Sequence, residues 1–199
     1  MISLRPSLKP YPEISLPEVL AESAGRFHNK VAAVHGPRTA TFGELNTRCT
    51  RIAFCLAELD VQPGQRVALM AQNSIEYIAA FFGILKAGGV IVPFSPAYSA
   101  REIGVQLRDC EPSAAIVDAD LMESFVGAGG DSIAGEKRIC IGKSSASPGP
   151  FLADFDTFPG KAVSLPPVTP DHLAVIAYSS GTTGVPKGVM LSHRNLAMN

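Results

Sequence analysis

The chain has 199 residues, of which 46% are hydrophobic and 18% charged, and this balance is typical of a globular protein rather than a disordered or fibrous one. The formal net charge is -1 and the basic residues are dispersed, which argues against a protein that binds nucleic acid or an anionic membrane. The length fits one domain or part of a larger one.

The first residues, MISLRPSLKPYPEISLP, contain four prolines and lack the basic start and apolar core of a signal peptide. We expect residues 1–14 to form an extended segment. The four cysteines have no metal-ligand spacing, so we expect them to be buried as small hydrophobes in a reducing compartment. They are Cys49, Cys55, Cys110 and Cys140. The sequence therefore predicts a cytoplasmic protein.

Three helices are predicted from capping boxes, in which a Ser or Thr and a Glu three residues later satisfy each other's free backbone amides. The boxes pair Ser15 with Glu18, Thr41 with Glu44, and Ser99 with Glu102. Apolar residues follow each box at helical spacing, so each helix is expected to bury one face. Thr41 and Glu44 are fully explained as a cap, and we assign them no catalytic role.

A fourth helix is predicted over residues 74–87, where apolar residues continue around much of the circumference and indicate deep burial. It belongs to the most apolar span of the chain, IAAFFGILKAGGVIVPF. Lys86 and the pair Gly88-Gly89 interrupt this span, which predicts a helix, a turn and a strand rather than a transmembrane segment. Pro93 is expected to end the strand.

Short β-branched runs alternate with these helices. They are predicted to be strands buried on both faces, and the alternation predicts an α/β fold with a mostly parallel sheet flanked by helices. The runs are residues 31–35, 66–71, 89–94, 114–118, 137–141 and 173–179. Two further stretches, 127–136 and 142–172, are predicted to be loops, and the second carries six prolines.

A polar, glycine-rich stretch, AYSSGTTGVPKGVMLSHRNL, covers residues 177–196. A loop that holds a triphosphate needs inward-pointing amides, glycines that let the main chain approach, hydroxyl donors and a cation. Residues 179–188 supply them all, and this ordered combination argues against an ordinary turn. The hydroxyls belong to Ser179, Ser180, Thr182 and Thr183, the glycines are Gly181 and Gly184, and the cation is Lys187.

The loop differs from the Walker A motif, although its lysine lies at the Walker distance from Gly181. Pro186 stands where Walker A has its second glycine, and Gly188 stands where it has the hydroxyl that binds Mg²⁺. The residues that follow, GVMLS, predict a strand instead of a helix. We therefore expect a strand-loop-strand phosphate site.

The histidines are predicted to be structural. His28, His35 and His172 each stand alone beside turn residues, and we expect them at the surface. His193 follows Ser192, which is a predicted N-cap of the final helix. Its expected role is to cap or, as an alternative, to orient the loop backbone.

Residues 178–189, YSSGTTGVPKGV, resemble the phosphate-binding signature of the adenylate-forming enzymes, which include acyl- and aryl-CoA synthetases, firefly-type luciferases and nonribosomal adenylation domains. Upstream, TATFGELNTRCTRIA and ILKAGGVIVPFSPAYSAREI are also similar to segments of this family. The passage 96–99 and the segment GVMLSHRNL resemble the 4-coumarate:CoA and fatty acyl-CoA ligase branch. Ser95 departs from that branch, which often has asparagine there.

The resemblance implies the fold of the N-terminal lobe of the large domain and a two-step reaction. A carboxylic acid attacks the α-phosphate of Mg·ATP to give an acyl-adenylate and pyrophosphate, and the thiol of CoA then displaces AMP. It also implies an ATP-binding set made up of Ser179, Ser180, Gly181, Thr182, Thr183, Gly184 and Lys187. No catalytic residue or metal ligand is expected within this chain.

Family members are several hundred residues long, and the later adenine and ribose motifs, the acidic metal-site residue, the acyl pocket and the C-terminal domain have no counterpart here. We therefore expect residues 15–199 to be a partial AMP-binding domain that is inactive alone. A peroxisomal location stays open for a longer eukaryotic parent. The alternatives are a non-catalytic binding or regulatory piece of the same fold, a luciferase-like enzyme, or one that loads a carrier protein.

Overall fold

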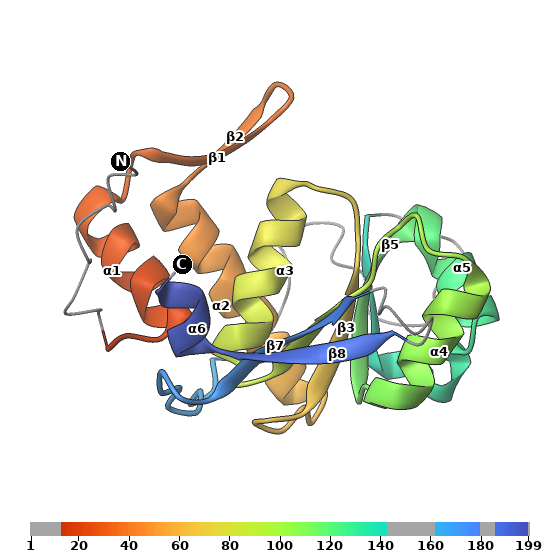
Figure 1. The fold of residues 1–199 in the computed structure, drawn as a ribbon. Coiled ribbons are helices and arrows are strands. Elements are labelled where there is room, and N and C mark those ends of the chain that lie inside the picture. Colours follow the sequence, from red (N-terminus) through yellow and green to blue (C-terminus); the bar gives the residue numbers. More distant parts are fainter. Residues whose placement is uncertain (1–12, 143–161, 180–185, 199) are drawn as a thin grey trace, which may run out of the picture.

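The main sheet of the computed structural model has six strands within the described residues, which are 13–142, 162–179 and 186–198 (Figure 1). Their order across the sheet is β6-β5-β3-β4-β7-β8. The bounds are β3 Arg66–Met70, β4 Val90–Pro93, β5 Ala114–Asp118, β6 Arg138–Ile141, β7 Leu173–Ser179 and β8 Lys187–Ser192. All neighbouring pairs are parallel except β7 with β8. The predicted α/β fold with a mostly parallel sheet is confirmed.

Helices cover both faces of this sheet (Figure 1). One face carries α1 Leu16–Phe27, α2 Phe42–Glu58 and α3 Ile75–Lys86, and the other carries α4 Ala100–Cys110 and α5 Met122–Gly127. Along β3, Val67 and Leu69 join the core under α1 to α3, whereas Ala68 and Met70 join the core under α4 and α5. Burial on both faces explains why the central strands are continuous apolar runs.

The topology explains why α3 and α4 lie on opposite faces. The chain passes from β3 through α3 to β4 on one side, then through α4 to β5 on the other side of β3. Right-handed crossovers in opposite directions place their helices on opposite faces. Such a reversal marks the edge at which α/β proteins bind ligands, outside the carboxyl ends of the strands.

The helix starts follow the predicted caps. Capping boxes form at Ser15, Thr41 and Ser99, and the Oγ of Ser74 accepts a hydrogen bond of 3.0 Å from the amide of Tyr77. Gly88 adopts a φ of +77° after α3, as expected of a helix C-cap. The buried face of α3 consists of Ile75, Ala79, Ala80, Gly83, Ile84 and Leu85. Its burial is less complete than predicted, because Phe81 and Phe82 stay partly exposed.

The prediction for residues 31–35 is wrong in part. They form β1 Val31–His35, but this strand pairs antiparallel with β2 Arg38–Thr41 in a hairpin separate from the main sheet. Val31 and Val34 are 54% and 68% exposed, so β1 is not buried on both faces. Gly36, with a φ of +58°, allows the tight turn that gives β1 a local partner. The sequence of β2, RTAT, lacks apolar alternation and was not predicted to be a strand.

Two other expectations need correction. Residues 127–136 are not merely a loop, since they contain 3₁₀ turns at Gly130–Ser132 and Gly135–Lys137, and α5 precedes them. The second half of β7 is only partly buried, and there the strand is paired with β8 alone. Within the predicted loop 142–172, residues 143–161 lie outside the described residues, and 162–169 form no helix or strand.

The prediction that the cysteines are buried is confirmed, since all four thiols are free and buried. Burial raises the pKa of Cys49, Cys55 and Cys110 to about 12. Across the described ranges, no helix combines the length and apolar character needed to cross a membrane.

Candidate active site

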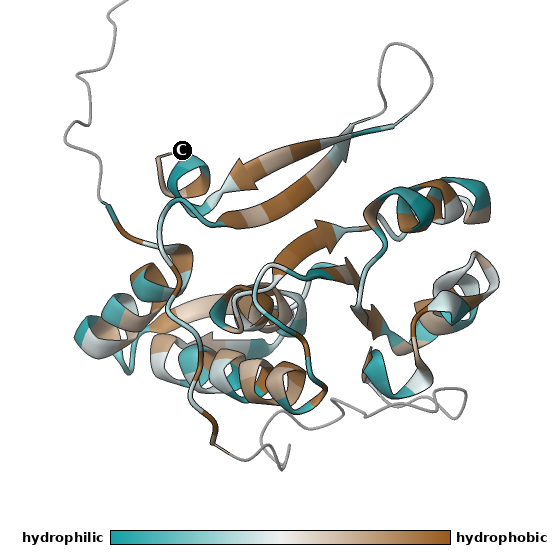
Figure 2. Ribbon diagram, turned by 90° about the horizontal axis from the view of Figure 1, so that it is seen from below, coloured by the Kyte–Doolittle hydropathy of each residue, from teal (hydrophilic) through white to brown (hydrophobic). Residues whose placement is uncertain are grey.

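The predicted phosphate loop connects β7 to β8, as a strand-loop-strand site requires. The two strands form an antiparallel hairpin in which Ser179 is paired with Lys187 and Tyr178 with Gly188. Residue 187 therefore begins a strand, not a helix, and the prediction that set this loop apart from Walker A is confirmed. Figure 2 shows the apolar residues that line both strands of the hairpin, on the side of the molecule where the C-terminus lies.

The structure describes two of the predicted ATP-binding residues. Ser179 and Lys187 stand at the two ends of the loop, and both are exposed. Directly opposed residues of an antiparallel pair share one face, so both side chains project on the same side of the hairpin. Among the described residues, Lys187 has no ion-pair partner. The rest of the predicted set lies outside the described residues: Ser180, Gly181, Thr182, Thr183 and Gly184.

The loop follows the carboxyl end of β7, and β7 runs parallel to β4 through the pair Ile91 and Val175. The carboxyl ends of β3, β4 and β5 therefore face the same edge of the sheet. At this edge, the amide of Gln72 donates a hydrogen bond of 2.7 Å to Oδ2 of Asp118. Burial raises the pKa of Asp118. This hydrogen bond links the carboxyl ends of β3 and β5.

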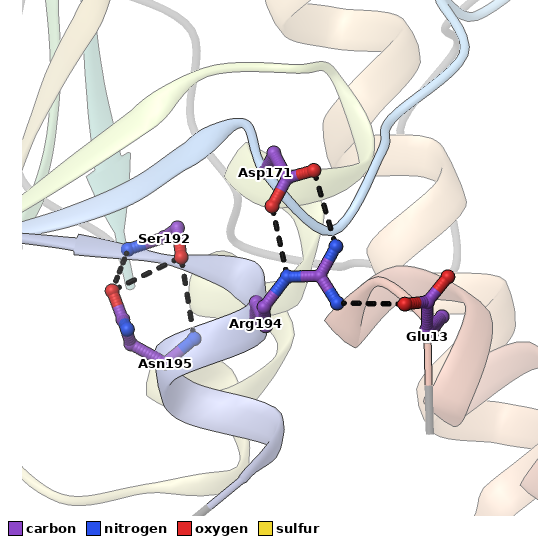
Figure 3. A network of polar contacts seen from close by, with 5 residues as sticks. All are labelled: Glu13, Asp171, Ser192, Arg194 and Asn195. Carbon is purple, nitrogen blue, oxygen red and sulfur yellow. Dashed lines mark hydrogen bonds and ion pairs between the residues drawn. The ribbon is translucent and has the colours of Figure 1, made fainter. Parts of the chain in front are cut away.

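The far end of the hairpin is fixed by α6 His193–Ala197 and the residues around it (Figure 3). Ser192 caps this helix and pairs with Asn195 in a capping box, as predicted for Ser192. The guanidinium of Arg194 contacts Asp171 through two hydrogen bonds, of 2.8 and 3.1 Å, and reaches Glu13 at 3.3 Å. The hydrogen bond and charge of Arg194 lower the pKa of Asp171.

His193 has the structural role that its position predicts, but with a different partner. Only 1% of the residue is exposed, and Nδ1 accepts a long hydrogen bond of 3.4 Å from the amide of Leu16 in α1. It thus ties α6 to the first helix and does not contact a described residue of the loop. Burial, with a smaller contribution from His172, lowers the pKa of His193 to about 4. His28, His35 and His172 are exposed, as predicted.

Sequence reasoning missed one contact beside the loop. The hydroxyl of Tyr178 donates a hydrogen bond to Oδ2 of Asp109, in the last turn of α4. Burial and this bond raise the pKa of Tyr178. The alternation of side chains along β7 indicates the face on which Tyr178 lies, but no pattern in the sequence identifies a partner 69 residues away.

Comparisons with known proteins agree with this architecture. A family model described as AMP-binding enzyme matches residues 20–199. A long-chain-fatty-acid–CoA ligase of Bacillus subtilis is 30% identical over 96% of this chain and 38% of its own length. Tyrocidine synthase 3 of Brevibacillus parabrevis is 33% identical over 96% of this chain and 3% of its own length.

The fold also matches solved structures. The apo structure of MbtA from Mycobacterium smegmatis superposes with a TM-score of 0.80 and 26% identity, covering 95% of this chain and 36% of MbtA. This chain therefore spans less than half the length of each of these three relatives. Since the family model covers residues 20–199, most of the chain, the chain belongs to the AMP-binding enzyme family.

Proposed function

We propose that this chain is part of an ATP-dependent acyl- or aryl-CoA ligase. In the first step a carboxylate oxygen bonds to the α-phosphorus of ATP while the bond to the β-phosphate oxygen breaks, which yields an acyl-adenylate and pyrophosphate. In the second step the thiol of CoA attacks the acyl carbon, and AMP leaves. The branch resemblance and the similarity to a fatty-acid–CoA ligase support CoA as acceptor.

The observation that carries this proposal is the placement of Ser179 and Lys187. They face each other across the two strand ends of a glycine-rich loop, at the carboxyl edge of a parallel sheet. The hydroxyl of Ser179 can donate a hydrogen bond to a phosphate oxygen, and the ammonium of Lys187 adds a positive charge. Donors and charge around the β- and γ-phosphates would stabilise the negative charge that develops on departing pyrophosphate.

Five of the seven residues between them complete the proposed ATP-binding set: Ser180, Gly181, Thr182, Thr183 and Gly184. Mg²⁺ is expected to accompany ATP. The described ranges contain no group of three acidic, histidine or cysteine side chains that could hold a metal ion, so we assign no ligand to it. The division into a segment 1–14 and a partial AMP-binding domain 15–199 stays a prediction, as does a cytoplasmic location.

The test is exchange of labelled pyrophosphate into ATP by the intact gene product, with a panel of aliphatic and aromatic carboxylic acids. We expect exchange with at least one acid, and release of AMP with a thioester once CoA is added. Lys187→Met should lower the exchange rate at least tenfold, because it removes the charge at the loop. Lys137→Met, at a lysine whose Nζ lies 3.5 Å from the carbonyl of Asp60, is the matched control.

The outcomes separate the candidate activities. Exchange without thioester formation from CoA would indicate a carrier-loading or luciferase-like enzyme, and absence of exchange with every acid would contradict adenylation. The 199-residue chain alone is expected to give no exchange, and measurable exchange would contradict that expectation.

A second candidate is a non-catalytic binding piece. It is favoured by apolar side chains exposed on β8, where Val189 and Met190 are 47% and 66% accessible. A compact monomer by light scattering, together with no partner in a pull-down, would count against it.

A further inference from the structure

The strand before the phosphate loop has little backbone pairing with its inner neighbour β4 near the site. β7 is paired with β4 only through Val175 and Ile91, four residues before Ser179. Beyond Val175, the backbone ladder of β7 continues on one side alone, with β8. The two strand ends that carry Ser179 and Lys187 therefore form a two-stranded ribbon, which is marginally stable by itself. Side-chain contacts must therefore hold it in place, and Ala177 and Ile176 already pack on the two cores.

Tyr178 supplies such a contact. Its side chain lies on the opposite face of the hairpin from Ser179, and its ring packs against the core under α4 and α5. Its hydroxyl donates to the carboxylate of Asp109, which belongs to α4 and not to the hairpin. A hydrogen bond to a charged acceptor is stronger than one between neutral groups.

The ring of Tyr178 lies beside Gly188, its paired residue on the neighbouring strand. A Cβ atom on Gly188 would stand 2.7 Å from Cγ2 of Ile176, and 3.4 and 3.6 Å from Cζ and the hydroxyl oxygen of Tyr178. A contact of 2.7 Å is closer than real Cβ atoms come, so a side chain at 188 would displace Ile176, while the two distances to Tyr178 are those of ordinary contact. The tyrosine thus lies over the backbone of the residue directly after Lys187.

The helix that carries Asp109, α4, is itself held in place by its cap and by close packing. α4 begins at the capping box of Ser99, and a Cβ atom on Gly104 would stand 2.8 Å from the carbonyl oxygen of Ala128. The helix therefore packs directly against the segment after α5. The hydrogen bond from Tyr178 to Asp109, which we call the tether, therefore connects the β7–β8 hairpin to a helix that is fixed on the main sheet.

We propose that Tyr178, held by Asp109 and seated over Gly188, is a positioning residue that fixes the two strand ends of the ATP-binding loop. This role rests on the proposed function. Tyr178 acts through the backbone of Ser179 and Lys187 and touches no reacting atom. When its hydroxyl is lost, Ser179 and Lys187 remain, but the strand ends that carry them are no longer bonded to α4.

The first test compares Tyr178→Phe, Asp109→Ala and Asp109→Asn in the intact gene product. Loss of one hydrogen bond predicts a rise in KM for ATP of roughly 3- to 10-fold in Tyr178→Phe and Asp109→Ala, with the KM for the acid unchanged. Asp109→Asn keeps an acceptor oxygen and should stay closer to the parent. The double variant Tyr178→Phe/Asp109→Ala should be no worse than either single variant, because both remove the same bond.

The matched control is Tyr77→Phe, which removes a phenol hydroxyl from α3, on the face of the sheet opposite to α4 (Figure 1). It should leave the KM for ATP unchanged. A structural role alone would lower thermal stability and the yield of active enzyme without changing the KM for ATP. An unchanged KM in Tyr178→Phe and Asp109→Ala, or additive effects in the double variant, would overturn the proposal.

A second readout needs no activity and so separates this inference from the proposed function. Amide hydrogen exchange in the nucleotide-free protein should become at least threefold faster at residues 176–179 and 187–190 in Tyr178→Phe, and not in Tyr77→Phe. Unchanged exchange at these amides would refute the positioning role even in an active enzyme. Failure of pyrophosphate exchange in the parent, with faster amide exchange in the variant, would refute the ligase assignment and leave the tether intact.

Discussion

Gly83 of α3 lies so close to Ile52 of α2 that a Cβ atom on the glycine would stand 2.6 Å from both Cβ and Cγ2 of the isoleucine. Ile52 is fully buried and cannot move aside into solvent. Overpacking of this kind costs about 1–3 kcal/mol. Alanine regains up to about 1 kcal/mol through its helix propensity. We expect Gly83→Ala to lower the free energy of unfolding by about 1–2 kcal/mol, measured by urea denaturation.

Gly25→Ala is the matched control, because Gly25 lies in α1 and a Cβ atom there would meet nothing within 4 Å. This substitution should raise the free energy of unfolding by about 0.5–1 kcal/mol. An equal rise in the free energy of unfolding in both variants would contradict the close contact between Gly83 and Ile52.

His193 should make stability depend on pH. Its pKa falls from the ordinary value of 6.5 to about 4 in the folded protein, so as the pH drops the unfolded chain binds a proton first. The free energy of unfolding should therefore decrease between about pH 6.5 and pH 4, by about 1–3 kcal/mol, and the effect should level off below pH 4.

The variant His193→Gln keeps a side-chain acceptor and removes this titration. Carboxylates also titrate in this range, so the informative quantity is the difference between the two stability curves, measured by chemical denaturation at each pH. Parallel curves across pH 4–6.5 would contradict a neutral, buried His193.

The four cysteines should be unreactive in the native protein. Burial raises their pKa values, to about 12 for Cys49, Cys55 and Cys110, so almost no thiolate is present at pH 8. We expect little labelling by iodoacetamide in buffer and labelling of all four thiols in denaturant, read by mass spectrometry. Rapid modification of even one thiol in the native protein would show that its burial is wrong.

Thr41 should contribute to stability and not to adenylation. Its Oγ1 accepts a hydrogen bond of 3.2 Å from the amide of Glu44, whose carboxylate accepts one of 2.8 Å from the amide of Thr41. Thr41→Ala removes the hydroxyl and should cost about 1 kcal/mol in urea denaturation. Thr39→Ala, at an exposed position of β2, is the control. A large fall in the rate of pyrophosphate exchange per folded molecule in Thr41→Ala would contradict the purely structural role.

Local signals predicted most of the fold because they are strong here. Ser15, Thr41 and Ser99 cap helices where the sequence places them, since a cap depends on residues only three positions apart. The central strands were recognisable from continuous apolar runs, which arise when helices cover both faces. The same reasoning failed for β1, because nothing in VAAVH distinguishes a central strand from half of a local hairpin.

Long-range contacts could not be predicted from such signals. The ATP-binding role of the loop between β7 and β8 stays a prediction from its own residues, and the structure shows that its two ends face each other as a strand-loop-strand site requires. The tether from Tyr178 to Asp109 depends on the order of strands in the sheet, which brings α4 beside the hairpin. The ion pairs of Arg194 with Asp171 and Glu13 likewise join segments far apart in the chain.

The bond between the amide of Leu16 and the imidazole of His193 has a consequence for synthesis on the ribosome. The two residues are 177 positions apart, so α1 leaves the ribosome long before its partner in α6 exists. At a translation rate of about 5–20 residues per second, the interval is roughly 10–35 seconds. During that time the face of α1 that meets α6 stays uncovered, which makes the nascent first helix a place where a chaperone can bind.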